Sequence, residues 1–497
     1  MRGIAAFALG VVMGTVRLWG ADAPQWGVAW TRNQVSDEKR LPVEFNTGPQ
    51  GNLRWSVDLG TETYSTPVIA HGRVLIGTNN HHPRNTNHLA DSGVMMCFDE
   101  KDGRFLWQMV VPKRIEDPFY DWPNTGMSSP ATVEGRRVYT VTNRGEVACL
   151  DLNGLADGND GPFTGEAQHM VQPGTVAGSL DATDADFVWL LDLVAAAGIW
   201  THDGIHCSVL IDGDFLYINT GTGVDNTHKV IRAPDAPSLV VVEKRTGRLL
   251  ARDNEHIAPD IFHCTWSSPS LAKVDGKPLL FFAGGNGRLF AFEPLKKAPP
   301  VGEVATLKKV WQLDFDPGAP KTDIHKYLSN KKESPSNIYG MLVFDHGSLY
   351  VAGGGDWFWG KNEAWLKRID PHGSGDITAT HIQWSAPLGR HTMSTPAVAD
   401  GLVYVADSQH FLRCIEAESG KEVWAHDVGG EVWASATVAD GKVYLGTRNG
   451  QFWALQAGRE KRVLGHADLG GAISSTAIAA NQTLYVATNS RLFAFRK

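Results

Sequence analysis

The sequence predicts an all-β protein that folds as an eight-bladed β-propeller of four-stranded antiparallel blades. Three observations predict this fold: a four-part unit recurs eight times, each unit holds a tight two-residue turn, and most units end in a strand that carries tryptophan. Four short strands in each repeat are the building unit of a propeller. We therefore expect the 497 residues to form one ring rather than the roughly three domains that length alone suggests.

The first two strands of each unit form a hairpin. Most units open with small hydroxyl-bearing residues: Ser65-Thr66-Pro67, Ser128-Ser129-Pro130, Cys207-Ser208-Val209, Ser267-Ser268-Pro269, Ser394-Thr395-Pro396, Ser435-Ala436-Thr437 and Ser474-Ser475-Thr476. Tyr339-Gly340 takes this place in the fifth unit. A short apolar run leads to a turn such as Asp275-Gly276 or Asp440-Gly441. Asp-Gly between apolar runs indicates a type I′ hairpin, because both central residues of that turn need positive φ.

The remaining strands of the unit follow in order. The second strand repeats an aliphatic residue before tyrosine, as in Val403-Tyr404, and the third reads small, apolar and acidic, as in Cys97-Phe98-Asp99. A further turn, such as Ser419-Gly420, leads to the fourth strand. The tryptophans of this strand are assigned to packing between blades: Trp55, Trp107, Trp189, Trp311, Trp384 and Trp424.

The two ends of the chain are expected to close the ring. The eighth unit stops on its third strand, Phe493-Ala494-Phe495, and Leu53-Arg54-Trp55 has the pattern of the missing fourth strand. Pairing these segments removes the exposed edges of an open array. We therefore expect a lead-in segment at residues 24–52 and the propeller at residues 53–497.

The spacing of acid, turn and tryptophan in Asp99 to Trp107 and in Glu416 to Trp424 resembles the tryptophan-docking repeat of the pyrroloquinoline quinone (PQQ) propellers. That family contains quinoprotein alcohol dehydrogenases and also non-enzymatic members such as the outer-membrane assembly factor BamB. The resemblance covers residues 53 to 497 and implies the architecture. It does not choose between the two kinds of member, because the docking tryptophans hold blades together in both.

Composition and the N-terminus indicate where the protein acts. The formal net charge of −8 argues against a nucleic-acid partner, which would need a clustered basic face. Residues 1–23 have the positive start, short apolar stretch and small residues of a signal peptide, with a buried N-terminal helix as the alternative. Beyond them no apolar run reaches the ~18 residues of a membrane span. We therefore expect a monomeric periplasmic or secreted protein without a transmembrane segment.

One face of the ring is expected to carry the function. The loops after the second and fourth strands are long in the first five units and minimal in the last three, and long loops on a rigid frame are usually functional. This loop-rich face is also rich in histidine and tryptophan. The residues expected near the mouth of its central channel are His206, Trp266, His391 and Trp433, and Trp357, Trp359 and Asp356 are also expected on this ligand-binding face.

The histidines of this face include four candidate metal ligands. They are His202, His206, His228 and His263. Two of them precede Cys207 and Cys264, and thiolate together with imidazole suits zinc or copper, although the spacing is no recognised metal motif. Two alternatives stay open. The cysteines form a disulfide in an oxidising compartment, or the histidines only bond to neighbouring backbone.

Three functions are compatible with these patterns. The first is a non-catalytic module that binds a protein, peptide or glycan on the loop-rich face. The alternative, implied by the resemblance, is a PQQ-dependent oxidoreductase of alcohols or sugars. Family members hold calcium with Glu, Asn and Asp oxygens, use an Asp as base, and place PQQ between a tryptophan and a disulfide of adjacent cysteines. A different metal-dependent enzyme is a third hypothesis.

If the protein is a PQQ-dependent oxidoreductase, the candidate cofactor-binding residues are Trp266, Asp203, Asp225 and Asn226. Asp203, Asp225 or Asp356 would serve as the base. The sequence departs from the family pattern because it contains no adjacent cysteine pair. It also lacks the Cys-x-x-Cys-His motif of a covalently attached haem. The binding module is therefore the preferred function.

Overall fold

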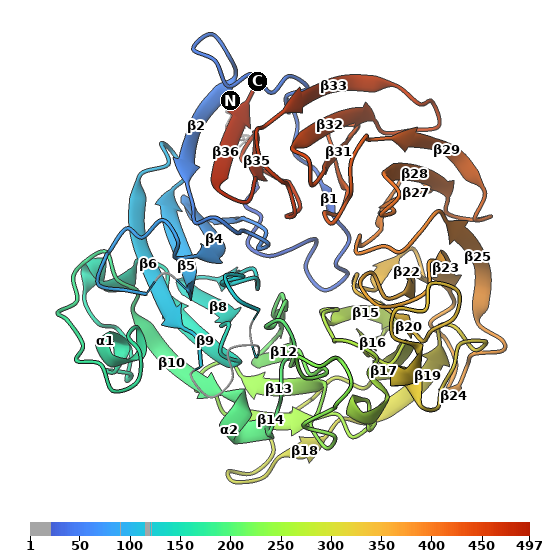
Figure 1. The fold of residues 1–497 in the computed structure, drawn as a ribbon, viewed down its shortest axis with the longest axis horizontal. Coiled ribbons are helices and arrows are strands. Elements are labelled where there is room, and N and C mark those ends of the chain that lie inside the picture. The colour runs from blue at the N-terminus through green and yellow to red at the C-terminus, as the bar shows by residue number, and fades with distance from the viewer. Residues whose placement is uncertain (1–20, 90, 115–119, 121) are drawn as a thin grey trace, which may run out of the picture.

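The structure is a computed structural model that describes residues 21–89, 91–114, 120 and 122–497 (Figure 1). Eight antiparallel sheets surround a central channel, which confirms the predicted propeller. Nearly all of the expected signal peptide lies outside the described residues. None of the helices in the described part of the chain has the length and apolarity needed to cross a membrane.

In blades 1 to 7 the main strands run in chain order from the channel outward, and in blade 8 the outermost strand is β2 from the start of the chain (Figure 1). Blade 1 contains β3 (Val68–Ala70), β4 (Arg73–Asn79), β5 (Ser92–Asp99) and β6 (Phe105–Pro112). Blade 2 contains β7 (Thr132–Glu134), β8 (Arg137–Val141), β9 (Glu146–Asp151) and β10 (Phe187–Asp192). Blade 3 contains β11 (Leu210–Asp212), β12 (Phe215–Asn219), β13 (Leu239–Glu243) and β14 (Leu249–Arg252). Blade 4 contains β15 (Ser270–Val274), β16 (Lys277–Ala283), β17 (Arg288–Phe292) and β19 (Lys309–Asp314).

Blade 5 contains β20 (Ser336–Asn337), β21 (Val343–Asp345), β22 (Ser348–Gly355), β23 (Ala364–Ile369) and β25 (Ile382–Leu388). Blade 6 contains β26 (Ala397–Ala399), β27 (Leu402–Ala406), β28 (Phe411–Glu416) and β29 (Glu422–Asp427). Blade 7 contains β30 (Thr437–Ala439), β31 (Lys442–Gly446), β32 (Gln451–Gln456) and β33 (Val463–Asp468). Blade 8 contains β34 (Ile478–Ala480), β35 (Thr483–Ala487), β36 (Arg491–Arg496) and β2 (Leu53–Asp58).

Helices occur only as short pieces in the connections between the described strands. They are α1 (Glu166–His169), α2 (Leu193–Ala197) and the 3₁₀ turns Gly154–Asp157, Ala258–Asp260 and Ile324–Tyr327. Two short strands from connections, β18 (Ala305–Thr306) and β24 (Gly375–Asp376), pair in parallel with β14 and β19, the outermost strands of the preceding blades. These additions protect two outer edges that would otherwise stay unpaired.

The ring closes as the sequence predicts. Strand β2 pairs antiparallel with β36, and the register sets Trp55 opposite Ala494 and Ser56 opposite Phe493. The first described strand of the repeat region thus supplies the outer edge of blade 8. The turn prediction is also confirmed, because Asp275 and Gly276 have φ values of 50° and 76°.

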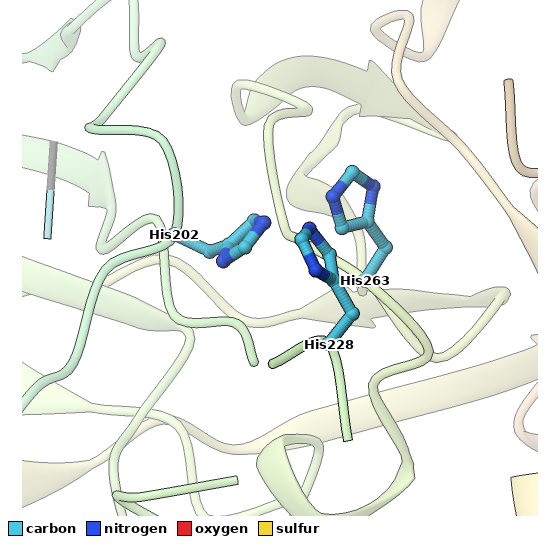
Figure 2. A group of neighbouring side chains, drawn as sticks. All are labelled: His202, His228 and His263. Carbon is cyan, nitrogen blue, oxygen red and sulfur yellow. The ribbon is translucent and has the colours of Figure 1, made fainter. Parts of the chain in front are cut away.

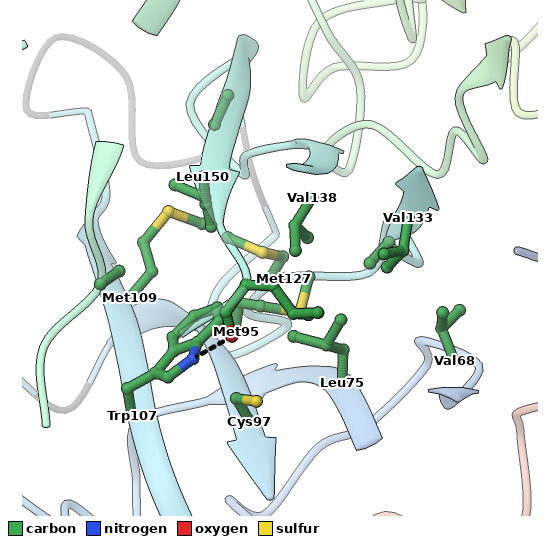
Figure 3. Close-up of a cluster of buried hydrophobic side chains, with 14 of the residues drawn as sticks. Val68, Leu75, Met95, Cys97, Trp107, Met109, Met127, Val133, Val138 and Leu150 are labelled. Carbon is green, nitrogen blue, oxygen red and sulfur yellow. Dashed lines mark hydrogen bonds between the residues drawn. The ribbon is translucent and has the colours of Figure 1, made fainter. Parts of the chain in front are cut away.

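The tryptophans of the fourth strands join each blade to the next. In every case the indole Nε1 donates a hydrogen bond to a backbone carbonyl of the following blade, and for Trp107 that acceptor is Leu152 at 2.9 Å. The same bond is made by Trp55, Trp189, Trp311, Trp384 and Trp424. Figure 3 shows Trp107 inside the apolar cluster between blades 1 and 2, beside Cys97 and Leu150. This confirms the packing role predicted for these residues.

Glycine is required where these indoles meet the next blade. A Cβ on Gly247 would lie 2.5 Å from Cε3 of Trp189, and the φ of Gly247 is +75°. Gly276 has nearly the same φ of +76°, but a Cβ there would meet no atom within 4 Å. Alanine at Gly276 therefore tests backbone strain alone, whereas alanine at Gly247 tests the same strain together with a clash against Trp189.

We expect Gly276→Ala to lower the free energy of unfolding by about 1–2 kcal/mol through left-handed backbone strain alone. Gly247→Ala is expected to lose about 1–3 kcal/mol more, because the methyl group overpacks the docking site. Denaturant unfolding of both variants measures the difference. Equal losses would show that the close approach of Gly247 to Trp189 does not matter.

The lead-in segment closes one end of the central channel. Its strand β1 (Val35–Ser36) pairs in parallel with β30 in blade 7, and Figure 1 shows the segment inside the ring. Further bonds from this part of the chain reach the innermost strands of the remaining blades. The bonded positions are Ile69, Val133, Ile211, Leu271, Phe344, Val398 and Ala479. Together with Ala23, which bonds to Ile69 in blade 1, the segment is a plug that contacts all eight blades, which the sequence did not indicate.

Arg32 is the central anchor of this plug. Its side chain is 0% exposed and inserts between blades 3 and 4. The guanidinium donates to the Pro269 carbonyl at 2.9 Å, to the Ser208 carbonyl at 2.8 Å and to Ser208 Oγ at 3.0 Å. A further bond reaches the carbonyl of Trp26 at 3.3 Å. Burial lowers the pKa of Arg32 to about 10.

Candidate functional site

A cavity of about 410 Å³ lies at the mouth of the channel on the loop-rich face. All eight blades contribute residues from the start of their first strand, including Thr66, Trp266 and Thr476. Trp26 of the plug also lines it. The plug therefore forms part of the cavity wall.

The cavity wall is largely aromatic. Trp266 lies 4.5 Å from His206 and 5.1 Å from Tyr339 between ring centroids. On the blade 7 side, Trp433 stacks on Tyr64 at 5.9 Å with an angle of 25° between the rings. Such flat, polarisable surfaces with hydroxyl groups between them are typical of ligand pockets.

The residues predicted at the mouth or elsewhere on the ligand-binding face fall into two groups. His206, Trp266, Trp359 and Trp433 line the cavity. The others lie beside it: Trp357 packs edge-on against the buried His391 at 5.4 Å, and Asp356 is fully buried behind His263. The loop that carries residues 356–359 contributes to the cavity through Phe358 and Trp359.

Three of the four histidines predicted as metal ligands meet at the cavity wall. His202, His228 and His263 come from three different loops of blades 3 and 4, and their ligand nitrogens lie within 4.8 Å of one another (Figure 2). His206 does not join them, because its Nε2 lies 3.1 Å from the Asp203 carbonyl and its ring packs on Trp266. His228 and His263 line the cavity directly.

Asp356 is the centre of a buried polar network. Its carboxylate accepts hydrogen bonds from His263 Nδ1 at 2.9 Å and from the Tyr339 hydroxyl. The backbone N–H groups of Phe358 and Trp359 add bonds of 3.0 and 2.8 Å. Burial alone would raise the pKa of Asp356, but these donors and the positive charge of His263 hold the pKa well below its ordinary value.

Burial and neighbouring charged groups shift the pKa values of the three imidazoles. Burial lowers the pKa of His202 well below its ordinary value, and the neighbouring His263 and His228 lower it further. Burial and His263 lower the pKa of His228 in the same way. For His263 the effect of burial is outweighed by Asp356, so its pKa is raised. His202 and His228 are therefore neutral at physiological pH.

The cysteines do not form the pair that the sequence left open. Cys207 and Cys264 are free and buried. Burial raises the pKa of Cys207 to about 11 and raises that of Cys264 as well, so both are thiols. Neither belongs to the histidine group. They are small buried residues, as Cys97, Cys149 and Cys414 are.

The residues do not fit PQQ and calcium as the dehydrogenases of the family hold them. Trp266 offers a flat face, but Asp225 turns away to Thr227 and Arg232, and neither it nor Asn226 lines the cavity. Among the residues described by the structure, Asp203 is the only carboxylate in the lining. Calcium prefers several oxygen ligands, whereas this wall presents imidazole.

Sequence reasoning missed several contributors to the site. Tyr64, Phe358 and Trp26 line the cavity, and Tyr339 both lines it and bonds to Asp356. One signal was present, because Tyr339 replaces the small hydroxyl residue that opens most other units. No local pattern marks Trp26, which reaches the cavity only through the fold of the plug.

Comparison with known proteins gives one family match. The family model described as "Outer membrane protein assembly factor BamB" matches residues 17–154 and 364–497, which is more than half of the chain. None of the curated proteins that were searched matched the sequence.

Solved structures share the fold at low sequence identity. BamB from Moraxella catarrhalis has 12% identity and a TM-score of 0.52, with coverage of 89% of this chain and 96% of that one. The computationally designed Ika8 protein has 10% identity and a TM-score of 0.52, covering 90% and 100%. Quinohemoprotein alcohol dehydrogenase from Comamonas testosteroni has 15% identity and a TM-score of 0.46, covering 96% and 80%.

Proposed function

Because the chain belongs to the family of PQQ-like propellers described by the outer membrane protein assembly factor BamB, we propose that it is an exported binding module for a partner protein. In this proposal a segment of the partner enters the cavity at the loop-rich mouth. The protein acts as a monomer in the periplasm or after secretion. The leader pattern of residues 1–23 supports export, and the description of the family supports a protein partner.

One observation carries the proposal: a cavity of about 410 Å³ with an aromatic wall at the mouth of the channel. Residues of the type found there, Trp and Tyr with an adjacent Arg, supply most of the energy of protein interfaces. The Arg448 guanidinium carbon lies 4.1 Å from the ring centre of Trp433, which holds that indole in place. An apolar side chain of the partner would bury its surface between Trp266 and Trp433.

Trp266→Ala is expected to weaken binding of a partner peptide by roughly 30-fold, because a central aromatic anchor is worth about 2 kcal/mol. Peptides are first selected on the wild-type protein by phage display, and their dissociation constants are then measured by calorimetry. If Trp266→Ala folds poorly, the dissociation constants are measured for Trp433→Ala, which changes a different blade.

The matched control is Trp453→Ala, because Trp453 stacks on His466 at 4.0 Å and does not line the cavity. We expect that variant to bind as the wild type does. Selected peptides that bind equally to both cavity variants would contradict the proposal. So would a protein that selects no peptide but binds glycans on an array.

A further inference from the structure

We propose that His202, His228 and His263 form a three-histidine site for a borderline divalent metal ion of the zinc type. The fourth coordination position of this ion opens into the cavity. The inference goes beyond the proposed function, since it requires no partner protein. It rests on the geometry of the rings, on their outer hydrogen bonds and on the backbone that carries them.

The three rings are nearly preassembled. Ring centroids are separated by 4.6 Å for His202 and His263, 4.8 Å for His202 and His228, and 5.4 Å for His228 and His263. Zinc–nitrogen bonds of 2.0–2.1 Å place tetrahedral ligand atoms about 3.4 Å apart. Since the nitrogens already lie within 4.8 Å, they need to approach by no more than about 1.5 Å.

Two of the histidines already make the outer bonds that metal ligands make. His202 Nδ1 lies 2.8 Å from the Val224 carbonyl, and His263 Nδ1 lies 2.9 Å from the Asp356 carboxylate. These oxygens can only accept, so Nδ1 carries the proton in both rings. Metal-bound histidines typically donate their second ring N–H to a carbonyl or carboxylate, which leaves Nε2 to bind the ion.

Two of the other ring nitrogens make no hydrogen bond within the part of the chain that the structure describes. Nε2 of His202 and Nε2 of His263 are buried and make no hydrogen bond to any described residue. An unsatisfied buried polar atom costs about 1–3 kcal/mol. A metal ion would satisfy both atoms at once, displacing any proton that His263 Nε2 carries.

The backbone at the site is held in strained conformations. His228 and Asp203 have φ values of 59° and 57°, in the left-handed region that non-glycine residues seldom adopt. Such strain tends to collect at ligand sites. Gly223 allows the loops to approach, because a Cβ there would lie 2.7 Å from Cβ of His202 and 2.6 Å from the His263 carbonyl oxygen.

The ligand set selects the class of metal. Imidazole suits zinc, copper and nickel, whereas calcium and magnesium prefer oxygen. Three protein ligands with an open position are the arrangement of reactive zinc sites. Asp203 lies next to that position: it lines the cavity, its Oδ2 is 3.5 Å from His202 Nε2, and its Oδ1 is buried without a partner.

A second carboxylate group is a poorer candidate. Asp151, Asp157 and Asp160 also lie close together. However, Arg136 bonds to all three carboxylates, and Arg137 also bonds to Asp151. These oxygens are already paired, so the group is explained as an ion-pair network.

The test is a titration of the chelator-treated full-length protein with zinc, followed by a chromogenic competitor, and with cobalt(II) as a spectroscopic probe. We expect one zinc per chain and a cobalt absorption band of the intensity typical of four- or five-coordinate sites. His228→Ala removes a half-exposed ligand and is expected to weaken zinc binding by more than the ~10–100-fold that loss of an outer-shell partner causes.

Two further variants test the role of the Asp356 hydrogen bond and provide a control at a histidine outside the site. Asp356→Asn would present an amide N–H to His263 Nδ1 and so force the proton to Nε2; we expect zinc binding to weaken by about 10–100-fold with an altered cobalt spectrum. His346→Ala, which removes an exposed histidine paired with Asp345, should bind zinc as the wild type does. Thermal melts confirm that each variant is folded.

The inference is overturned if the wild-type protein shows no saturable zinc binding at micromolar concentration. It is equally overturned if folded His228→Ala binds zinc as tightly as the wild type, because the ion would then occupy another site. The titration contains no peptide, so a negative result leaves the proposed function standing, and failure of peptide binding leaves the metal site standing.

Discussion

Replacing Arg32 with alanine is expected to lower the free energy of unfolding by about 3 kcal/mol or more. The guanidinium is fully buried and supplies bonds to carbonyls of the plug and of blades 3 and 4. Each buried acceptor left without a donor costs about 1–3 kcal/mol. Removal of the unfavourable burial of the charge offsets part of this loss, which sets the lower end of the expected range.

Denaturant unfolding measures this loss, with Lys39→Ala as the control in the same segment. Lys39 is exposed, so we expect its replacement to change stability by no more than about 0.5 kcal/mol. A comparable small loss for Arg32→Ala would mean that the plug is not anchored through its guanidinium. Because Arg32 bonds to the carbonyl of Trp26, the variant should also loosen the lining of the cavity.

The ring itself could be predicted because its signals are local. Each Asp-Gly turn, each tyrosine of a second strand and each docking tryptophan identifies its own element within a few residues. The closing pair of Trp55 and Ala494 was also predictable, since the missing strand of the last unit had one matching pattern elsewhere.

The plug could not be predicted, because its contacts are long-range. Arg32 bonds to Ser208 across 176 positions of sequence and to Pro269 across 237. No periodicity marks a segment that lies across the ends of eight strands. A lone arginine in such a segment is usually solvent-exposed, so nothing in the sequence suggests complete burial.

The sequence indicates which face of the ring carries the candidate site, but not how the individual side chains of the site are oriented. His202, His228 and His263 were identified as candidates because they lie in long loops, and the fold brings them together. Asp225 lies close to His228 in sequence but bonds to Thr227 and Arg232 instead. Loop conformation decides such orientations, and residue spacing in a loop carries little information about it.

Asp356 was predicted as a residue of the ligand-binding face, and we expect its replacement with alanine to have the other large effect. In metal-free protein, Asp356→Ala should lower the free energy of unfolding by about 3–5 kcal/mol, as loss of one member of a buried ion pair does. The change leaves His263, Tyr339 and two backbone N–H groups without their acceptor. Denaturant unfolding with a chelator present measures the loss.

An exposed pair in the same protein provides the control. His346 Nδ1 lies 2.7 Å from Asp345, a distance similar to that between His263 and Asp356, but its side chain is exposed to solvent. Asp345→Ala should therefore cost less than about 1 kcal/mol. Similar losses in the two variants would show that burial of the Asp356 network contributes nothing.

The dependence of this loss on pH tests the same pair. The pKa of Asp356 lies below its ordinary value of 3.8, so its contribution is present above pH 3.8 and is lost as pH falls through the lowered pKa. The pKa of His263 lies above its ordinary value of 6.5, so its contribution is complete below pH 6.5 and is lost as pH rises through the raised pKa. The difference between wild type and Asp356→Ala should therefore be largest between pH 3.8 and 6.5. A difference that grew steadily above that window would contradict a charged His263–Asp356 pair.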